Sequence, residues 1–280
     1  MSIACADCAH GYLDSGLPKG TVIQVNGIST YVSLATKAEG VLVNDGRAVV
    51  IFTDVFGFEL ANVRLIADAF AASGLTCYVP DLCNGTAMQA DVWDPIILPS
   101  KPGTGILARV AGGLKFAVSL PSLISWMGKH GVKDTMPIID SFLDGLKESQ
   151  SVTSIGILGY CWGGLYALLI GGVHTRDIIA AVATAHPSNA KIPGDFEALK
   201  KPALIHLSET DFLISHTQAG NIIKIAENKA KTSHLDVTAK IMKGTVHGYA
   251  VRGNEDDVQV AKARKDTLEE QIVFFKKHLR

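Results

Sequence analysis

A cysteine lies between glycines in the segment Gly159-Tyr160-Cys161-Trp162-Gly163-Gly164, which contains the pattern G-x-C-x-G. The segment follows the apolar run Ser154–Leu158, typical of a buried strand, and precedes the helical run Leu165–Ile170. A sharp turn from strand to helix raises its central side chain above the sheet, and it needs glycines where a neighbouring chain passes too close for a Cβ atom. We therefore expect Cys161 to be a nucleophile. The helix N-terminus favours its thiolate, and the N–H of Trp162 points at a developing oxyanion.

The turn has other interpretations that need weighing. A buried cysteine without chemistry is also common in glycine-rich turns between strand and helix. A dinucleotide site does not fit, because Gly156, Gly159 and Gly163 lack the spacing G-x-G-x-x-G, and no Walker lysine follows the glycines. The choice between a nucleophile and a structural cysteine depends on the residues that come later in the chain.

An acid and a histidine follow Cys161 in the order nucleophile, acid, histidine, which is the order used by α/β-hydrolases. Asp211 comes just after the apolar run Ala203–Leu207, where active-site groups of open α/β sheets collect. His247 lies between a late strand and the last helix. We expect Cys161, Asp211 and His247 to form a catalytic triad. Glu209 is the rival acid, and His186 is a further histidine that follows a strand.

Alternating strand and helix patterns predict the elements that must position these groups. Asn26-Gly27 predicts a hairpin between Thr21–Val25 and Thr30–Leu34. Further strands are expected at Ala48–Phe52, Leu75–Val79, Ile178–Ala183 and Asp236–Met242, with helices at Glu59–Ser73, Met136–Ser149, Ile214–Lys229 and Asp257–His278. The last helix should bury Leu268, Ile272, Phe275 and Leu279. The expected fold is one α/β domain over residues 1–280, with a mostly parallel sheet and helices on both faces.

Two segments do not follow this alternation. Residues 1–20 form an irregular leader, and residues 80–115 form a long loop rich in proline and glycine. Loops of this length inside compact domains are usually functional, so we expect the loop to lie near the active site like a lid.

The composition excludes several classes of protein. The net charge is −1, which offers no electrostatic basis for binding nucleic acid or a membrane surface. The five cysteines are an odd number, and residues 1–20 do not read as a secretory signal, so we expect reduced thiols in the cytoplasm. Cys5 and Cys8 lack a second ligand pair for zinc, so no metal is expected. Cys77 or Cys83 would be the resolving thiol if Cys161 were a redox sensor. Without an exposed apolar stripe, we expect a monomer with at most weak self-association.

The motifs together resemble the dienelactone hydrolase (carboxymethylenebutenolidase) family, particularly its eukaryotic branch. The matching segments are Pro18-Lys19-Gly20-Thr21, Thr53-Asp54-Val55-Phe56-Gly57, Pro80-Asp81-Leu82, Gly159–Gly164, His186-Pro187-Ser188, Thr210-Asp211 and His247–Arg252. The resemblance implies an α/β-hydrolase fold without a large cap domain. It also implies a cofactor-independent enzyme that opens unsaturated lactones.

The resemblance also implies further site residues. Asp54 corresponds to a carboxylate that helps to generate the thiolate, and the N–H of Val55 would be the second oxyanion donor. Arg252 corresponds to an arginine that binds the substrate carboxylate, although it also suits a surface arginine paired with Glu255 or Asp256. The remaining candidate substrate-binding residues are Phe56, Tyr160, Tyr249 and His186. Lys101 and Arg109 are the candidate cations inside the long loop.

The expected function is hydrolysis of a small, anionic lactone or ester, such as dienelactone, through a thiol acyl-enzyme. Two alternatives stay open at this stage. One is a short-acyl esterase or thioesterase that uses the same triad. The other is a small-molecule receptor that keeps the scaffold without catalysis.

Overall fold

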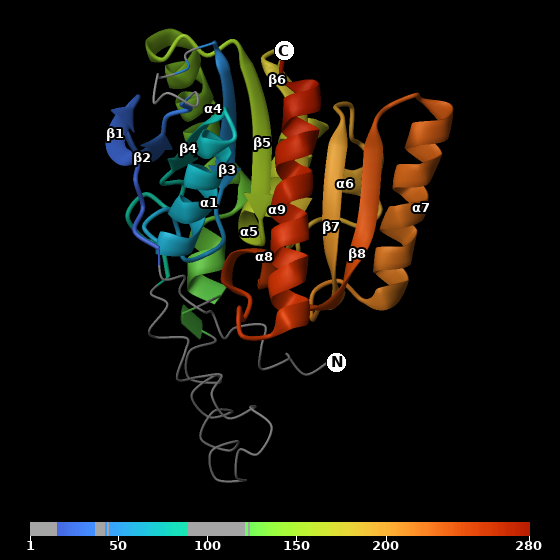
Figure 1. Ribbon diagram of the computed structural model, residues 1–280. Helices are drawn as coiled ribbons and strands as arrows, with labels where there is room; N and C mark the ends of the chain where they lie inside the picture. Colours follow the sequence, from blue (N-terminus) through green and yellow to red (C-terminus); the bar gives the residue numbers. More distant parts are fainter. Residues whose placement is uncertain (1–15, 37–42, 44, 89–120, 123) are drawn as a thin grey trace, which may run out of the picture.

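The structure is a computed structural model that describes residues 16–36, 43, 45–88, 121–122 and 124–280. Eight strands form one sheet in the order β1-β2-β4-β3-β5-β6-β7-β8 (Figure 1). Their bounds are β1 Thr21–Val25, β2 Ile28–Ser33, β3 Arg47–Phe52, β4 Thr76–Pro80, β5 Ser154–Tyr160, β6 Ile179–Ala185, β7 Ala203–Thr210 and β8 Val237–Val246. β2 is antiparallel to β1 and β4, and the other neighbouring pairs are parallel. The predicted α/β-hydrolase fold with a mostly parallel sheet is confirmed.

The predicted hairpin at the edge of the sheet is also confirmed. Val25 pairs with Ile28, so Asn26 and Gly27 form a two-residue turn. Their φ angles are 48° and 79°, which lie in the left-handed region that Asn and Gly tolerate best.

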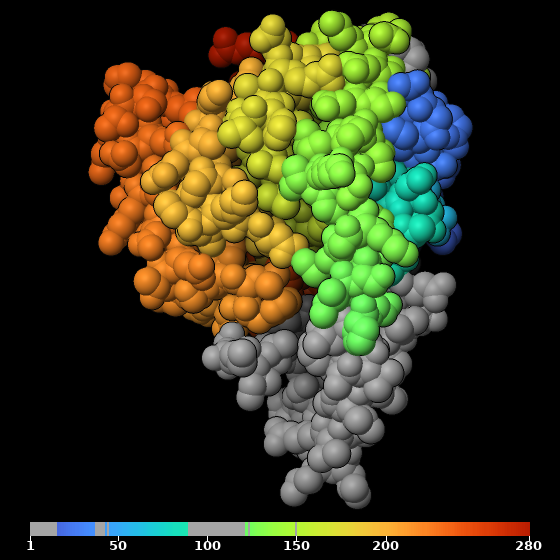
Figure 2. All heavy atoms as spheres, turned by 180° about the vertical axis from the view of Figure 1, so that it is seen from behind, coloured from blue at the N-terminus to red at the C-terminus, as the bar shows by residue number. Residues whose placement is uncertain are grey.

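Helices cover both faces of the sheet. α1 (Ala61–Ala72), α8 (Tyr249–Arg252) and α9 (Val258–His278) share one apolar cluster with the sheet, on the face toward the viewer in Figure 1. α4 (Val132–Ser149), α5 (Trp162–Gly171), α6 (Gly194–Glu197) and α7 (His216–Thr232) share the other cluster, on the face that Figure 2 shows. The described residues contain no cap domain. No described helix combines the length and apolar character that a membrane span requires.

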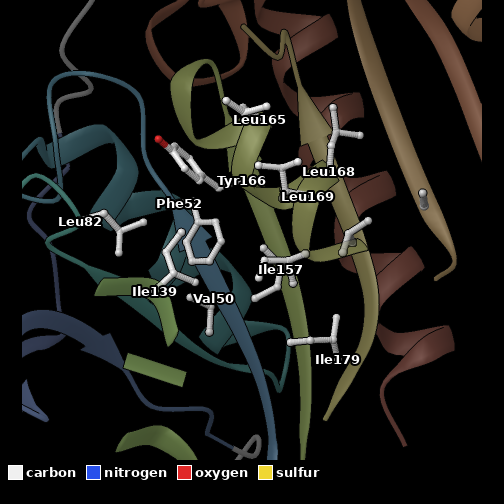
Figure 3. Packing of buried hydrophobic residues seen from close by; sticks show 14 of the residues in the cluster. Val50, Phe52, Leu82, Ile139, Ile157, Leu165, Tyr166, Leu168, Leu169 and Ile179 are labelled. Atoms are coloured by element: carbon white, nitrogen blue, oxygen red, sulfur yellow. The ribbon is translucent and has the colours of Figure 1, made fainter. Parts of the chain in front are cut away.

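Helix α5 packs at the centre of the second cluster. Every residue of this helix is buried, which explains why its sequence has no polar stripe. Leu168 and Leu169 lie among side chains from β3 and β5, including Phe52 and Ile157 (Figure 3). This packing holds the start of the helix, and with it Cys161, in place against the sheet.

Several predicted element boundaries need correction near the carboxyl edge of the sheet. β5 continues beyond Leu158 to Tyr160, and α5 begins at Trp162 instead of Leu165, so the turn holds Cys161 alone. β8 continues beyond Met242 to Val246 because Val246 pairs with Thr210 of β7. His247 therefore follows its strand directly.

The predicted core face of α9 is only partly correct. Phe275 and Leu279 are buried as expected, whereas Leu268 and Ile272 are only partly buried. The centre of the face holds Thr267, Gln271 and Phe274. The burial of Thr267 and Gln271 does not follow from the helical pattern, because their hydrogen-bond partners are the hydroxyls of Tyr249 and Tyr160 on other elements. The short helices α6 and α8 were also not predicted, since each forms only one turn.

Candidate active site

The turn at Cys161 has the strained geometry that its sequence predicts. Cys161 has φ 50° and ψ −115°, an unfavourable region for a residue with a side chain, and it is the N-cap of α5. A Cβ atom on Gly159 would lie 2.4 Å from the carbonyl oxygen of Gly163. A Cβ atom on Gly163 would lie 2.2 Å from the carbonyl oxygen of Phe52. Both glycines are therefore required by close approach of the backbone.

The structure brings Cys161, His247 and Asp211 together from the ends of β5, β8 and β7. The His247 Nε2 atom lies 3.1 Å from the Cys161 Sγ atom. The His247 Nδ1 atom lies 2.8 Å from the Asp211 Oδ2 atom. The other Asp211 carboxylate oxygen accepts a hydrogen bond from the N–H of Leu213. This chain of contacts can take a proton from the thiol and hold the resulting imidazolium.

The surroundings of His247 favour its charged form. Burial by itself lowers the pKa of this imidazole, but Cys161 and the hydrogen-bonded carboxylate of Asp211 outweigh burial and raise the pKa to about 10. A neighbouring thiol and a protonated imidazole stabilise each other as a thiolate–imidazolium pair.

Two backbone segments adjoin the turn at Cys161, and they carry the two N–H groups that the sequence analysis expects to be oxyanion donors. Trp162 opens α5, so its N–H has no acceptor four residues earlier in the helix. The loop after β3, which carries Val55, is fixed against the same turn by a bond from the N–H of Gly163 to the Thr53 carbonyl. The indole of Trp162 is buried and donates to the His130 carbonyl, so this side chain belongs to the core and not to the pocket wall.

Asp54 and Arg252 form a buried ion pair beside the triad. The Arg252 Nε atom lies 3.4 Å from Asp54 Oδ2, and the guanidinium carbon lies 4.1 Å from the centre of the Phe56 ring. Burial raises the pKa of Asp54, although the Arg252 charge opposes this shift. The Asp54 carboxylate also accepts the N–H of Phe56.

The alternative of a surface Arg252 is wrong, because its side chain is only 9% exposed and Glu255 pairs with Arg264 instead. Among the described residues, the contacts of the Asp54 carboxylate are with Arg252 and the backbone of Phe56. A direct contact between Asp54 and the thiol, as the resemblance implies, is not part of this arrangement.

Three candidate substrate-binding residues lie deeper than expected. Tyr160 and Tyr249 are buried and bond through their hydroxyls to Gln271 and Thr267 of α9, so we withdraw them as substrate contacts. His186 is fully buried, with its ring centre 5.0 Å from that of His247. Burial, and then the nearby His247 and Arg252 charges, lower the pKa of His186 well below its ordinary value. His186 is thus a neutral ring beside the imidazole of His247.

Sequence reasoning missed two side chains at the site. The ring of Phe212 lies beside the imidazole of His247, tilted by 60° with ring centres 5.0 Å apart, and is exposed to solvent. The hydroxyl of Ser188 lies 3.8 Å from Cys161 Sγ. Both residues sit in recognised segments, directly after Asp211 and within the His186-Pro187-Ser188 motif, but neither residue type has a chemical role that is evident from spacing alone.

The remaining candidates lie apart from this site or outside the described residues. Glu209, the rival acid, accepts the N–H of Gly244 instead of contacting His247. Cys77 and Cys83 are buried thiols with raised pKa values, chiefly through burial, which makes them poor resolving thiols. In the described ranges, no cluster of His, Cys, Asp or Glu side chains is suited to hold a metal ion. The predictions for Cys5, Cys8, Lys101, Arg109 and most of residues 1–20 and 80–115 lie outside those ranges.

Comparisons with known proteins agree with this fold. Residues 32–279 match the family model described as "Dienelactone hydrolase family". The chain is 25% identical over 276 residues to "Hydrolase tropI" of Talaromyces stipitatus, with 98% of this chain and 96% of that protein covered. It is 27% identical over 256 residues to "Carboxymethylenebutenolidase homolog" of Homo sapiens, with 89% and 86% covered. A crystal structure of a putative dienelactone hydrolase from Klebsiella pneumoniae has the same fold, with a TM-score of 0.63, 15% identity, and 93% and 98% of the two chains covered.

Proposed function

The chain belongs to the dienelactone hydrolase family, whose members are hydrolases of lactones and esters, and from that premise we propose that it cleaves its substrate through a thiol acyl-enzyme on Cys161. The observation that carries the proposal is the unbroken line of contacts from Sγ through the imidazole to the carboxylate, at 3.1 Å and 2.8 Å. These are hydrogen-bond distances suited to proton transfer from a nucleophile to a general base.

The proposed reaction has an acylation and a deacylation step. His247 takes the thiol proton, and the Cys161 thiolate attacks the carbonyl carbon. The backbone N–H groups of Trp162 and Val55 hold the oxyanion, and His247 returns the proton to the leaving oxygen. In deacylation, His247 takes a proton from water, the hydroxide attacks the thioester, and the Cys161 thiolate leaves. Asp211 keeps the imidazole in one tautomer throughout.

We propose an unsaturated lactone with a carboxylate as the substrate, held by Arg252. A second candidate, a neutral short-acyl ester, is supported by a specific contact. The Arg252 charge is already paired with Asp54, and both side chains are less than one-tenth exposed, at 9% and 4%. A carboxylate would therefore have to share a cation that already has a partner. This costs more than binding to a free arginine, since a buried charge needs full compensation.

The test compares two substrates, a dienelactone carboxylate and p-nitrophenyl acetate. Wild-type enzyme should hydrolyse at least one of them and accumulate on Cys161 the acyl group of that substrate, which is acetyl for p-nitrophenyl acetate and the ring-opened acyl group for the lactone, detected by mass spectrometry after rapid quenching. Cys161→Ala should lose turnover and adduct, whereas Cys83→Ala, which removes another thiol, should keep both. Persistent turnover in Cys161→Ala would contradict the proposal.

Arg252→Met separates the two substrate classes. Loss of dienelactone turnover with retention of acetate ester turnover indicates an anionic lactone. Equal retention of both activities indicates that Arg252 does not bind the substrate carboxylate, which favours neutral esters.

A further inference from the structure

The turn after β6 carries a serine whose hydroxyl faces the nucleophile. Ser188 is buried, at 4% exposure, and its Oγ atom accepts a hydrogen bond from the Cys161 thiol, with Sγ and Oγ 3.8 Å apart. Once Cys161 has lost its proton, the same contact can run only from the Ser188 O–H to sulfur. Among the described residues, the hydrogen-bond partner of the Ser188 hydroxyl is the Cys161 thiol. A buried hydroxyl normally has a hydrogen-bond partner, so the contact with sulfur is the one that satisfies Ser188.

The backbone around Ser188 fixes the position of the hydroxyl. The N–H of Ser188 donates to the Cys161 carbonyl at 2.9 Å, and the N–H of Cys161 donates to the Ala185 carbonyl at 3.3 Å. The turn and the nucleophile are therefore joined by two hydrogen bonds in opposite directions. Pro187 adds close packing, since a Cβ atom on Gly164 would lie 2.8 Å from its Cα atom. Ser188 cannot move away from Cys161 without breaking this frame.

We propose that Ser188 is a catalytic residue whose O–H donates a hydrogen bond to the Cys161 thiolate. The inference rests on the proposed function, because it takes Cys161 as the nucleophile. A neutral thiol sulfur is a weak acceptor, and a thiolate is a strong one, so the hydroxyl stabilises the charged form selectively. With His247 protonated, the thiolate accepts one N–H and one O–H.

The hydroxyl acts wherever sulfur carries charge in the reaction. It stabilises the thiolate before attack, and it stabilises the same thiolate as the leaving group when the acyl-enzyme breaks down. Ser188 exchanges no proton in either step. The proton of the thiol goes to His247, and the serine keeps its own.

Replacing Ser188 changes none of the other charged or titratable groups around the triad. They are His247, with Asp211 behind it, the buried ring of His186, and the ion pair between Asp54 and Arg252. A shift in thiol reactivity on loss of the hydroxyl is therefore assigned to Ser188.

The test is the rate of Cys161 alkylation by iodoacetamide as a function of pH, measured by mass spectrometry on the full chain. In Ser188→Ala, the midpoint of the curve should rise by about 1 pH unit. Alkylation at pH values below the midpoint should then be about tenfold slower, because only the thiolate reacts. The plateau at high pH should be unchanged. Ser188→Gly should behave in the same way, and Ser188→Thr should restore the wild-type midpoint.

Ser154→Ala is the matched control, because it removes another buried serine hydroxyl at the opposite end of β5. Its alkylation curve should coincide with that of wild type. Thermal unfolding of each variant shows whether the fold is kept, and Ser188→Gly serves if Ser188→Ala fails to fold.

Superimposable curves for wild type, Ser188→Ala and Ser188→Gly would overturn the role of Ser188. That outcome is distinct from failure of the proposed function, which would appear as a wild-type Cys161 with the alkylation curve of an ordinary thiol. Ser188→Thr separates this role from a purely structural one, since it restores the hydroxyl and hence the midpoint, whereas a packing defect is not repaired by a larger side chain.

Discussion

The buried ion pair between Asp54 and Arg252 allows a sharp prediction about stability. At 3.4 Å and an effective dielectric constant of about 20, two unit charges attract each other by about 5 kcal/mol. The side chains are 4% and 9% exposed, so removing one partner leaves the other charge without compensation from water. Asp54→Asn and Arg252→Met should each lower the free energy of unfolding by about 3–5 kcal/mol.

The double variant Asp54→Asn/Arg252→Met should be about as stable as the better single variant, because neither charge is then buried alone. Urea unfolding followed by tryptophan fluorescence measures all four proteins, and the double-mutant cycle gives the coupling energy. We expect a coupling of about 3–5 kcal/mol, equal to the loss of the less stable single variant. Additive losses, with coupling below about 0.5 kcal/mol, would refute the reasoning.

The pH dependence of Arg252→Met provides a second readout of the same pair. Burial already raises the pKa of Asp54, and the Arg252 charge opposes that shift. Removing Arg252 therefore raises the pKa further above the unfolded value of about 3.9. A folded-state pKa above the unfolded value makes folding less favourable as pH rises. Arg252→Met should thus lie closer to wild type in stability at pH 4–5 than at pH 8.

Three further predictions concern other parts of the chain. Gly163→Ala should strongly lower the thermal unfolding midpoint or abolish soluble expression, because the added Cβ atom would lie 2.2 Å from a carbonyl oxygen of β3. The control Gly220→Ala has open space around the added Cβ atom, and it should leave stability unchanged or raise it. Glu270 has a pKa lowered to about 2, first by its hydrogen bond from His206, so the stability it contributes is present above about pH 4.5 and lost as pH falls toward 2. Glu270→Gln should therefore differ from wild type in thermal unfolding by less than about 1 kcal/mol at pH 7, since the group is partly exposed, and the difference should vanish near pH 2. His130→Ala should lower the free energy of unfolding in urea by about 2–3 kcal/mol, because the His130 ring stacks on Trp126 with ring centres 4.0 Å apart and bonds to the Thr86 hydroxyl. A loss below about 0.5 kcal/mol would contradict this packing.

The order of elements was predictable because it depends on local patterns. The strand ending at Phe52, the hairpin at Asn26-Gly27 and the last helix follow from hydrophobic spacing and turn residues, which act over a few neighbouring residues. The triad was predictable for a related reason. Residues that follow parallel strands meet at one edge of the sheet, so chain order alone brings Cys161, Asp211 and His247 near one another.

The surroundings of the triad were not predictable in the same way. Tyr160 directly precedes Cys161 and Tyr249 follows His247 by two residues, yet the hydroxyls of both tyrosines bond to α9. Arg252 was compatible with the surface from its spacing to Glu255, but α8 turns it inward onto Asp54. Each of these outcomes depends on which side chains of distant elements fill the same space.

The sequence by itself determined the strand–turn–helix at Cys161, the parallel sheet and the three residues of the proposed triad, because these depend on local backbone preference and on chain order. Only the tertiary structure decided that Asp54 pairs with Arg252, that His186 is a buried ring behind His247, and that Ser188 reaches the thiol. Hydrogen bonds and ion pairs act over a few ångströms in space, and the partners at this site are separated by tens to hundreds of residues in the chain.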